Sequence, residues 1–382
     1  MYEELTGKFL SVQTVLRDDS HTEYAQSFPQ FDFSSIDFEQ QVTKLLHTYL
    51  NPQVTWEAVP KGILTGDSDD AIVVRATDAN QIYYLKFTSS LHVQLGMLFA
   101  YSYFHDYPHP FCKAAKIVSH GTITLKNCTS SYFMLLEKAE GEDIAAAFEN
   151  NEIEVIYSYA ETAAKVLAYN HSNHVSKSTT LDKLLYGSRT SNLLIEDLYK
   201  LRGKVASDSP LISGCQNIIP FLLEKEREYL ISPQVHSLSV SPLKIWNLNY
   251  SMENRMISLF DTTGFFKYCA PSQLPRWAPE TEFTTFINNI EFLGCFWKLD
   301  PSNIQKIEDR FLQTYYQNIR RPIMTREGLN LFMTQRYLVS VKNFISLSSS
   351  DNDFEEKALK MLFDFSHFSK RGNLKVSKLL GG

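Results

Sequence analysis

The sequence predicts a two-lobed α+β fold, in which a small antiparallel sheet is followed by a larger helical region. Three observations support this prediction. Strand-like patterns, with alternating apolar residues and many β-branched or aromatic side chains, are concentrated before Gly141. Helical patterns dominate after it, and only the stretch 243–261 interrupts them with short strands. A chain of 382 residues is long enough for two such lobes.

The elements before Gly141 follow from local patterns. Residues 1–34 are rich in Ser, Asp and Phe and predict an irregular arm. A helix is expected to begin after Ser35, which can cap it, and to end before the breaker pair Asn51-Pro52. Strands are predicted at 54–58, 71–75, 82–87, 114–118 and 132–136, with an apolar helix at 91–106.

The helical lobe begins after the hinge-like glycine at 141. Long helices are predicted at 152–171 and 211–231, and several more between residues 280 and 368. The predicted domains are therefore an N-terminal arm and helix over 1–50, a sheet-containing lobe over 51–140 and a helical lobe over 141–382.

Composition and charge narrow the class of protein. The chain is 44% hydrophobic and 21% charged, which is typical of a folded protein with a large core. A net charge of −6 gives no reason to expect a nucleic-acid surface, and no run of 18 apolar residues could cross a membrane. The five cysteines form no C-x-x-C pair, and the acidic start Met1–Leu5 lacks an apolar signal region. We therefore expect a cytoplasmic protein whose partner is a small molecule or another protein, and neither nucleic acid nor a membrane.

The stretch from Val240 to Asn247, VSPLKIWN, has the spacing of a phosphotransferase catalytic loop. A loop of the H-x-D-x-x-x-x-N type places an Asp beside the substrate hydroxyl and an Asn on Mg²⁺, and a second Asp follows to hold the metal. Here Asn247 is present, and Asp261 follows fourteen residues later, after the predicted strand 256–260. Pro242 stands at the position of the first Asp and cannot accept a proton.

With this loop, the chain resembles the aminoglycoside phosphotransferase and choline kinase-like family, although no single motif is intact. The resemblance covers roughly residues 50–340. Its other parts are the glycine loop Gly62–Asp70, the lysine strand Tyr83–Lys86, the hinge Tyr132–Gly141 and the helix end Ala163–His171. It implies a two-lobed protein-kinase-like fold, with an antiparallel-sheet N-lobe and a mostly helical C-lobe, and it implies ATP and Mg²⁺ as cofactors.

The resemblance also implies nucleotide-binding roles for single residues. Lys86 would neutralise the phosphates, and Lys244 would lie near the transferred phosphate as the remaining catalytic residue. Gly66 and Ser68 of the glycine loop and Glu137 of the hinge would contact the nucleotide. An ordinary strand lysine with a solvated tip is the alternative for Lys86.

Two residues are the expected metal ligands. Asn247 and Asp261 would hold Mg²⁺ through their side-chain oxygens. Asn249 competes with Asn247 for this role, and Asp261 could instead cap the turn that follows it, because Thr-Thr-Gly comes next.

The sequence departs from the family pattern at further positions besides Pro242. Gln94 falls where the helix after the lysine strand normally offers a Glu, so it could hydrogen-bond Lys86 but not neutralise it. Tyr84 occupies the strand position that roofs the adenine pocket in kinases. Three carboxylates also crowd the predicted phosphate loop, namely Asp67, Asp69 and Asp70.

Two main functions remain open at this point, besides a weaker third one, a protein-interaction scaffold that uses the aromatic-rich helical lobe. The first is a pseudokinase, a binding or regulatory module with weak or no nucleotide binding. The second is an active ATP-dependent phosphotransferase or nucleotidyltransferase acting on a small molecule or a protein. This second hypothesis is chemically reasonable because phosphoryl transfer depends more on positioning and electrostatics than on a base.

Overall fold

The structure is a computed structural model that describes residues 29–32, 37–59, 71–88, 91–124, 131–173, 175–201, 210–238, 243, 245–260 and 276–347. By contacts the chain forms two compact units. The sheet unit comprises Thr14–Thr162 and Lys244–Pro275, and the helical unit comprises Met1–Gln13, Ala163–Leu243 and Arg276–Gly382. The domain boundaries predicted at residues 50 and 140 stay predictions.

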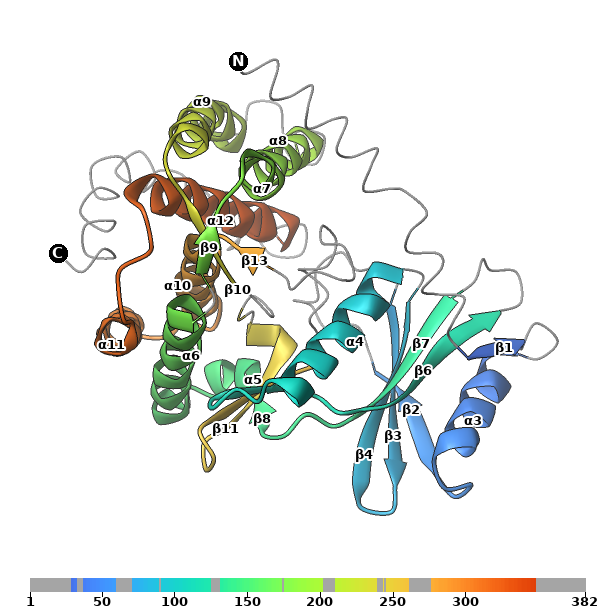
Figure 1. The fold of residues 1–382 in the computed structure, drawn as a ribbon. Coiled ribbons are helices and arrows are strands. Elements are labelled where there is room, and N and C mark those ends of the chain that lie inside the picture. Colours follow the sequence, from blue (N-terminus) through green and yellow to red (C-terminus); the bar gives the residue numbers. More distant parts are fainter. Residues whose placement is uncertain are drawn as a thin grey trace. The chain divides into compact units, whose positions relative to one another are not determined.

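A six-stranded sheet forms the first part of the sheet unit (Figure 1). Its strands are β1 (Gln30–Asp32), β2 (Thr55–Ala58), β3 (Ala71–Asp78), β4 (Gln81–Thr88), β6 (Ile117–Thr124) and β7 (Ser131–Glu137), in the order β1-β6-β7-β4-β3-β2. The predicted antiparallel sheet is confirmed for five of them. The exception is β1, which the sequence did not predict and which pairs parallel to β6.

Two helices pack on opposite faces of this sheet (Figure 1). Helix α3 (Phe38–Tyr49) is capped by Asp37, whose Oδ1 accepts from the Gln40 N–H at 2.9 Å, whereas the predicted cap Ser35 lies outside the described residues. The core beneath α3 includes Val42, Leu45, Leu46, Val74, Leu85 and Phe133. Helix α4 (Leu91–Asp106) has the predicted bounds, and its Met97 packs on Met134 and Leu136 of β7.

A four-stranded sheet completes the sheet unit. Its strands are β5 (Cys112–Ala114), β8 (Glu142–Asp143), β11 (Leu248–Ser251) and β12 (Met256–Leu259), in the order β5-β12-β11-β8. The short strands predicted within 243–261 are therefore confirmed as the β11–β12 hairpin, which follows the 3₁₀ turn η2 (Ile245–Asn247). The hairpin pairs through β11 with β8, which is the next strand after β7 along the chain. Helix α5 (Ile144–Glu149) begins at Asp143.

The helical unit holds the end of α6 (Ile153–Asn173), which begins in the sheet unit. Its helices are α7 (Thr180–Lys183), the π-helix η1 (Leu184–Ser188), α8 (Arg189–Leu201), α9 (Pro210–Ile231), α10 (Pro279–Phe296), α11 (Pro301–Asn318) and α12 (Arg326–Leu347). A small sheet in the order β13 (Arg276–Trp277), β10 (Val235–Leu238), β9 (Val175–Lys177) accompanies them. Phe286 of α10 stacks on Phe311 of α11 with ring centroids 4.0 Å apart. Among the described helices, none is both long and apolar enough to cross a membrane.

The first turn of α10 buries a carboxyl group. Glu280 is 0% exposed, and its Oε1 accepts from the Thr325 backbone N–H at 2.7 Å and from the Thr325 hydroxyl at 3.1 Å. Burial raises the pKa of Glu280 to about 7, since it penalises the charged form. The folded chain therefore binds this proton more tightly than the unfolded chain does.

This pKa shift predicts how stability depends on pH. Stability contributed by Glu280 is fully present below the unfolded pKa of about 4.5 and is lost as the pH rises through about 7. Glu280→Gln keeps an acceptor for Thr325 and cannot ionise. We expect the variant to match the wild type near pH 5 and to exceed its unfolding free energy at pH 8 by up to roughly 3 kcal/mol, measured in urea.

Glu327→Gln on α12 is the matched control, because it removes one nearby charge from a half-buried position. Its effect at pH 8 is expected to be much smaller. A Glu280→Gln variant that is less stable than the wild type at pH 8 would show that the buried carboxylate is favourable.

Candidate functional site

Lys86 lies on the face of the six-stranded sheet that α4 covers. It pairs with Val73 of β3 and Met134 of β7, and it is half-buried. Because alternate residues of a strand point to the same face, Tyr84 shares this face with Lys86. The core on this face contains Met134 together with Met97 of α4. The predicted lysine strand is thus present, with its lysine beside the helix that follows it, and the phosphate role of Lys86 stays a prediction.

Gln94 does not make the hydrogen bond to Lys86 that the sequence suggested. It is only 1% exposed, and its Nε2 donates to the backbone oxygen of Phe133 at 2.8 Å. The interaction joins α4 to β7. The single acidic residue of α4 is Asp106 at its last position, so this helix brings no carboxylate to the lysine strand. The suggested hydrogen bond from Gln94 to Lys86 is not made, because the side-chain amide of Gln94 donates instead to a buried backbone oxygen of β7.

Glu137 is the last residue of β7. The segment between β7 and β8, residues 138–141, follows it directly, and we call this segment the linker. The backbone N–H of Glu137 donates to the oxygen of Lys116 at 2.9 Å, and its carboxylate lies 2.5 Å from Lys116 Nζ. This contact raises the pKa of Lys116. The next residue, Lys138, donates its N–H to the oxygen of Ile82 at 2.8 Å. The start of the linker is therefore fixed to the strands on both sides of β7.

The β11–β12 hairpin holds the rest of the linker. Asn249 of β11 is 7% exposed, and its Nδ2 donates to the oxygens of Ala139 at 2.8 Å and Gly141 at 3.2 Å. Asn254 in the hairpin turn donates from Nδ2 to Glu140 Oε1 at 2.6 Å. Lys113 of β5 pairs with the same carboxylate, and these two hydrogen bonds lower the pKa of Glu140.

The contact between linker and hairpin also requires a glycine at position 141. Gly141 has φ +93°, and a Cβ there would lie 2.4–2.6 Å from backbone atoms of Tyr250 and Ser251. Any side chain would clash with the backbone of β11. The glycine that the sequence identified as the end of the hinge is thus a place of close backbone approach.

The structure distinguishes the two asparagines that competed for the metal role. The amide of Asn249 is already bonded to linker carbonyls. Asn247, the last residue of η2, is half-buried, and its side chain makes no hydrogen bond with the described residues. Its backbone oxygen accepts from the Phe260 N–H at 3.2 Å, which brings the residue directly before Asp261 beside Asn247. Asn247 is therefore the better candidate for a cation ligand. The structural role of Asn249 was missed because its contacts lie 108–110 residues away.

The remaining predicted site residues lie outside the described part of the chain. These are Gly66 and Ser68 of the glycine loop, Pro242 and Lys244 of the catalytic loop, and Asp261. Within the described ranges, no group of three or more His, Cys, Asp or Glu side chains could hold a metal ion. Asn247 has an amide oxygen of the kind that Mg²⁺ prefers, so its metal role stays a prediction, and a magnesium site would need Asp261 as well.

His171, the last residue of the helix stretch that resembles the family, is held by contacts with other buried side chains. It is fully buried in the helical unit, with Nδ1 2.9 Å from the Tyr315 hydroxyl and Nε2 3.4 Å from Glu282 Oε2. Tyr315 stands T-shaped against its ring. These contacts account for the histidine without a metal.

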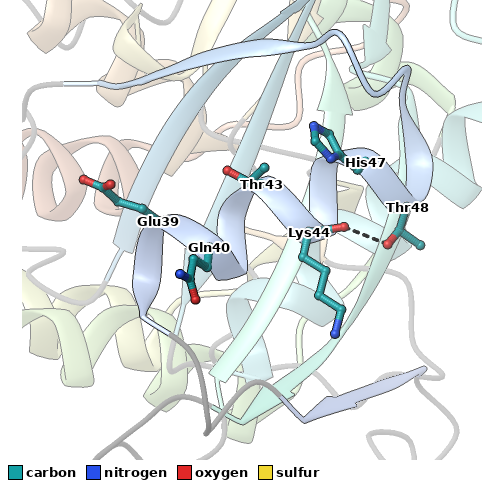
Figure 2. Close-up of a pocket in the computed structure, with 6 residues that line it drawn as sticks. All are labelled: Glu39, Gln40, Thr43, Lys44, His47 and Thr48. Carbon is teal, nitrogen blue, oxygen red and sulfur yellow. Dashed lines mark hydrogen bonds between the residues drawn. The ribbon is translucent and has the colours of Figure 1, made fainter.

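A hollow of about 540 Å³ lies along α3 (Figure 2). It is lined by Glu39, Gln40, Thr43, Lys44, His47 and Thr48, all on one helix. Since α3 packs on the sheet face opposite to Lys86, this hollow is separate from the predicted nucleotide site.

The environment of Gln94 yields a test. Gln94→Glu would place a carboxylate against the Phe133 oxygen and remove its donor, so we expect an unfolding free energy lower by about 1–3 kcal/mol in urea. Gln94→Met, which fills a similar volume without charge, is the matched control and should cost less. If Gln94→Glu instead stabilises the protein, the new carboxylate has found a cation such as Lys86, and the assignment of Gln94 is wrong.

Comparison with known proteins identifies the fold. No family model and no curated protein sequence matches the chain. Among solved structures, the spectinomycin phosphotransferase APH(9)-Ia, in complex with ADP and spectinomycin, is similar with a TM-score of 0.52 and 13% identity, over 85% of this chain and 93% of that one. Aminoglycoside phosphotransferase APH(4)-Ia has a TM-score of 0.52 and 13% identity, over 85% and 97%. A glucosamine kinase in complex with glucosamine, ADP and inorganic phosphate has a TM-score of 0.51 and 10% identity, over 87% and 84%. The chain therefore has the protein-kinase-like fold of the aminoglycoside phosphotransferases, as the sequence resemblance predicted.

Proposed function

We propose that this protein is a pseudokinase, a kinase-like binding or regulatory module with weak or no nucleotide binding. One observation carries the proposal: Pro242 occupies the position of the proton-accepting Asp, in a chain that otherwise keeps Lys86, Asn247 and Asp261. Loss of a general base costs on the order of 10²–10⁴ in rate.

The environment of the lysine strand supports the same proposal. In an active kinase site a Glu from the following helix pairs with the phosphate-binding lysine. Helix α4 has Gln94 at this place, and the amide is bonded to the Phe133 oxygen. Helix α4 thus supplies no carboxylate at the place where the family pattern has its Glu, which favours weak nucleotide binding.

The residues that would hold a nucleotide are those of the family pattern. Solved structures with this fold contain ADP or an ATP analogue, in the glucosamine kinase and in aminoglycoside phosphotransferases. By analogy, Lys86 and Lys244 would contact phosphates, and Gly66, Ser68 and Glu137 would contact other parts of the nucleotide. A bound Mg²⁺ would supply positive charge to the phosphates, held by Asn247 and Asp261.

The second candidate is an active ATP-dependent phosphotransferase or nucleotidyltransferase on a small-molecule or protein acceptor. The hydrogen-bonded frame favours it, because η2, the hairpin and the linker are joined by direct hydrogen bonds. In this reading Asp261 and Asn247 hold Mg²⁺, and Lys86 and Lys244 hold the phosphates. We further propose a cytoplasmic location and a small-molecule or protein partner.

Binding of Mg²⁺-nucleotide can be measured by thermal shift. A ligand at a hundredfold excess over its Kd stabilises the folded state by about 2.7 kcal/mol. We expect Mg·ATP to raise the Tm at millimolar concentration, and Asp261→Ala or Lys86→Met to abolish the rise. A shift that survives Asp261→Ala would place the ligand elsewhere, and no shift at all would leave a module without nucleotide.

The chemistry can be tested by restoring the carboxylate. Pro242→Asp returns a proton acceptor to the loop, and we expect it to raise the rate of ADP formation from Mg·ATP by about 10²–10⁴-fold. Ser241→Asp, which places the same charge one residue earlier, is the matched control and should give no gain. A wild-type rate equal to that of Pro242→Asp would contradict the pseudokinase proposal.

A further inference from the structure

We propose that Arg336 of α12 is the cationic centre of an anion-binding site in the helical unit, and that the ligand carries a phosphate or carboxylate group. The predicted kinase-like motifs assign no role to this residue. The proposal does not depend on nucleotide binding or on phosphoryl transfer, so it stands or falls separately from the proposed function.

Contacts one turn away on either side place Arg336 inside the helical unit. Residues four apart on a helix lie on the same face. Phe332, four residues before Arg336, packs T-shaped against Tyr229 of α9, with ring centroids 5.2 Å apart. Ser340, four residues after it, donates from its hydroxyl to Asn288 Oδ1 of α10 at 3.0 Å. Arg336 therefore lies on the side of α12 that faces α9 and α10.

The guanidinium of Arg336 has no anionic partner in the part of the chain that the structure describes. No hydrogen bond or ion pair joins it to any of the described residues. By contrast, Lys342 on the same helix lies 2.6 Å from Asp197 Oδ2 of α8. An arginine presents five N–H donors and no acceptor, so the partner that fits Arg336 is an anion rich in acceptor oxygens.

Arg336 is surrounded by protein without being covered by it. Burial lowers the pKa of Arg336 to about 10, because it disfavours the charged form, and the group still carries its charge at neutral pH. The side chain as a whole is only half-buried, and its nitrogens are not among the fully covered polar atoms that lack a partner. A small ligand can therefore reach a charge that is partly desolvated and unpaired, which favours binding of an anion.

The facing helix offers a second donor without an acceptor. Asn288 is 5% exposed, and its Oδ1 already accepts from the Ser340 hydroxyl. Its amide nitrogen makes no hydrogen bond with the described residues. Since the guanidinium and this amide nitrogen can only donate, they suit a ligand that only accepts. Phosphate and carboxylate groups meet this condition, and both match the planar fork of an arginine.

Thermal unfolding of the full chain with inorganic phosphate and with malonate, as the carboxylate probe, tests the proposal. The buffer contains no other multivalent anion, and chloride keeps the ionic strength constant. We expect a saturable rise in Tm with at least one probe, because a ligand that binds only the folded state stabilises it. Arg336→Met keeps a side chain of similar shape without the charge and should abolish the rise. A general salt effect would not saturate and would appear equally in this variant.

Two further variants sharpen the test. Arg326→Met, the matched control, makes the same substitution at an exposed position of the same helix and should keep the wild-type response. Arg336→Lys keeps the charge and loses the planar fork, and we expect it to raise the Kd of the bound probe about tenfold. Without either probe, Arg336→Met should have a higher Tm than the wild type, since it removes an unpaired and partly desolvated charge.

Each outcome decides for or against the site. A saturable response to phosphate alone identifies a phosphorylated ligand, and a response to malonate alone identifies a carboxylate ligand; either supports the proposal when Arg336→Met abolishes it. A wild type that responds to neither probe, or a response that persists in Arg336→Met, would overturn it. If Arg336→Met does not fold, Arg336→Lys decides, because an unchanged Kd in that variant excludes Arg336 as the anion ligand.

Discussion

The close contact between the linker and the β11–β12 hairpin is the constraint on which the candidate site depends. Gly141 brings its backbone so near to Tyr250 and Ser251 that no side chain fits between them. This approach lets β8 pair with β11 and lets Asn249 reach two linker carbonyls. Through the same hairpin, η2 and the residue before Asp261 are placed at one end of β11 and β12. The predicted metal ligands therefore depend on a contact that contains no catalytic residue.

This constraint explains how a kinase-like frame can persist when its chemistry is altered. Binding a nucleotide requires the strand with Lys86, the linker and the hairpin in a fixed relation, and each of these is held by backbone pairing or by buried hydrogen bonds. Deprotonating an acceptor requires, in the family pattern, one further carboxylate in the catalytic loop. In the proposed pseudokinase, Pro242 at that position would remove the base from a chain whose strand pairings and linker contacts have the kinase-like arrangement.

The sequence predicted the parts of the fold that local patterns determine. The hairpin strands near 71–88 and the helix at 91–106 were correct, because each has a strong period and clear breakers at its ends. Strands of two or three residues, such as β1, β8 and β13, were missed because segments this short have no recognisable period. The roles of Gln94 and Asn249 were also beyond local patterns, since their partners are 39 and 108–110 residues away. The loop residues Gly66, Ser68 and Lys244 stay predictions.

Native-state hydrogen exchange on the full chain tests the central constraint most directly. If the linker and hairpin form one body, the hydrogen-bonded amides of β8, β11 and β12 open together, with the same free energy and the same dependence on denaturant. The account predicts this common value in the wild type. Amides of β8 that open far more easily than those of β11 and β12 would contradict it, because the linker would then be free of the hairpin that directly follows Asn247.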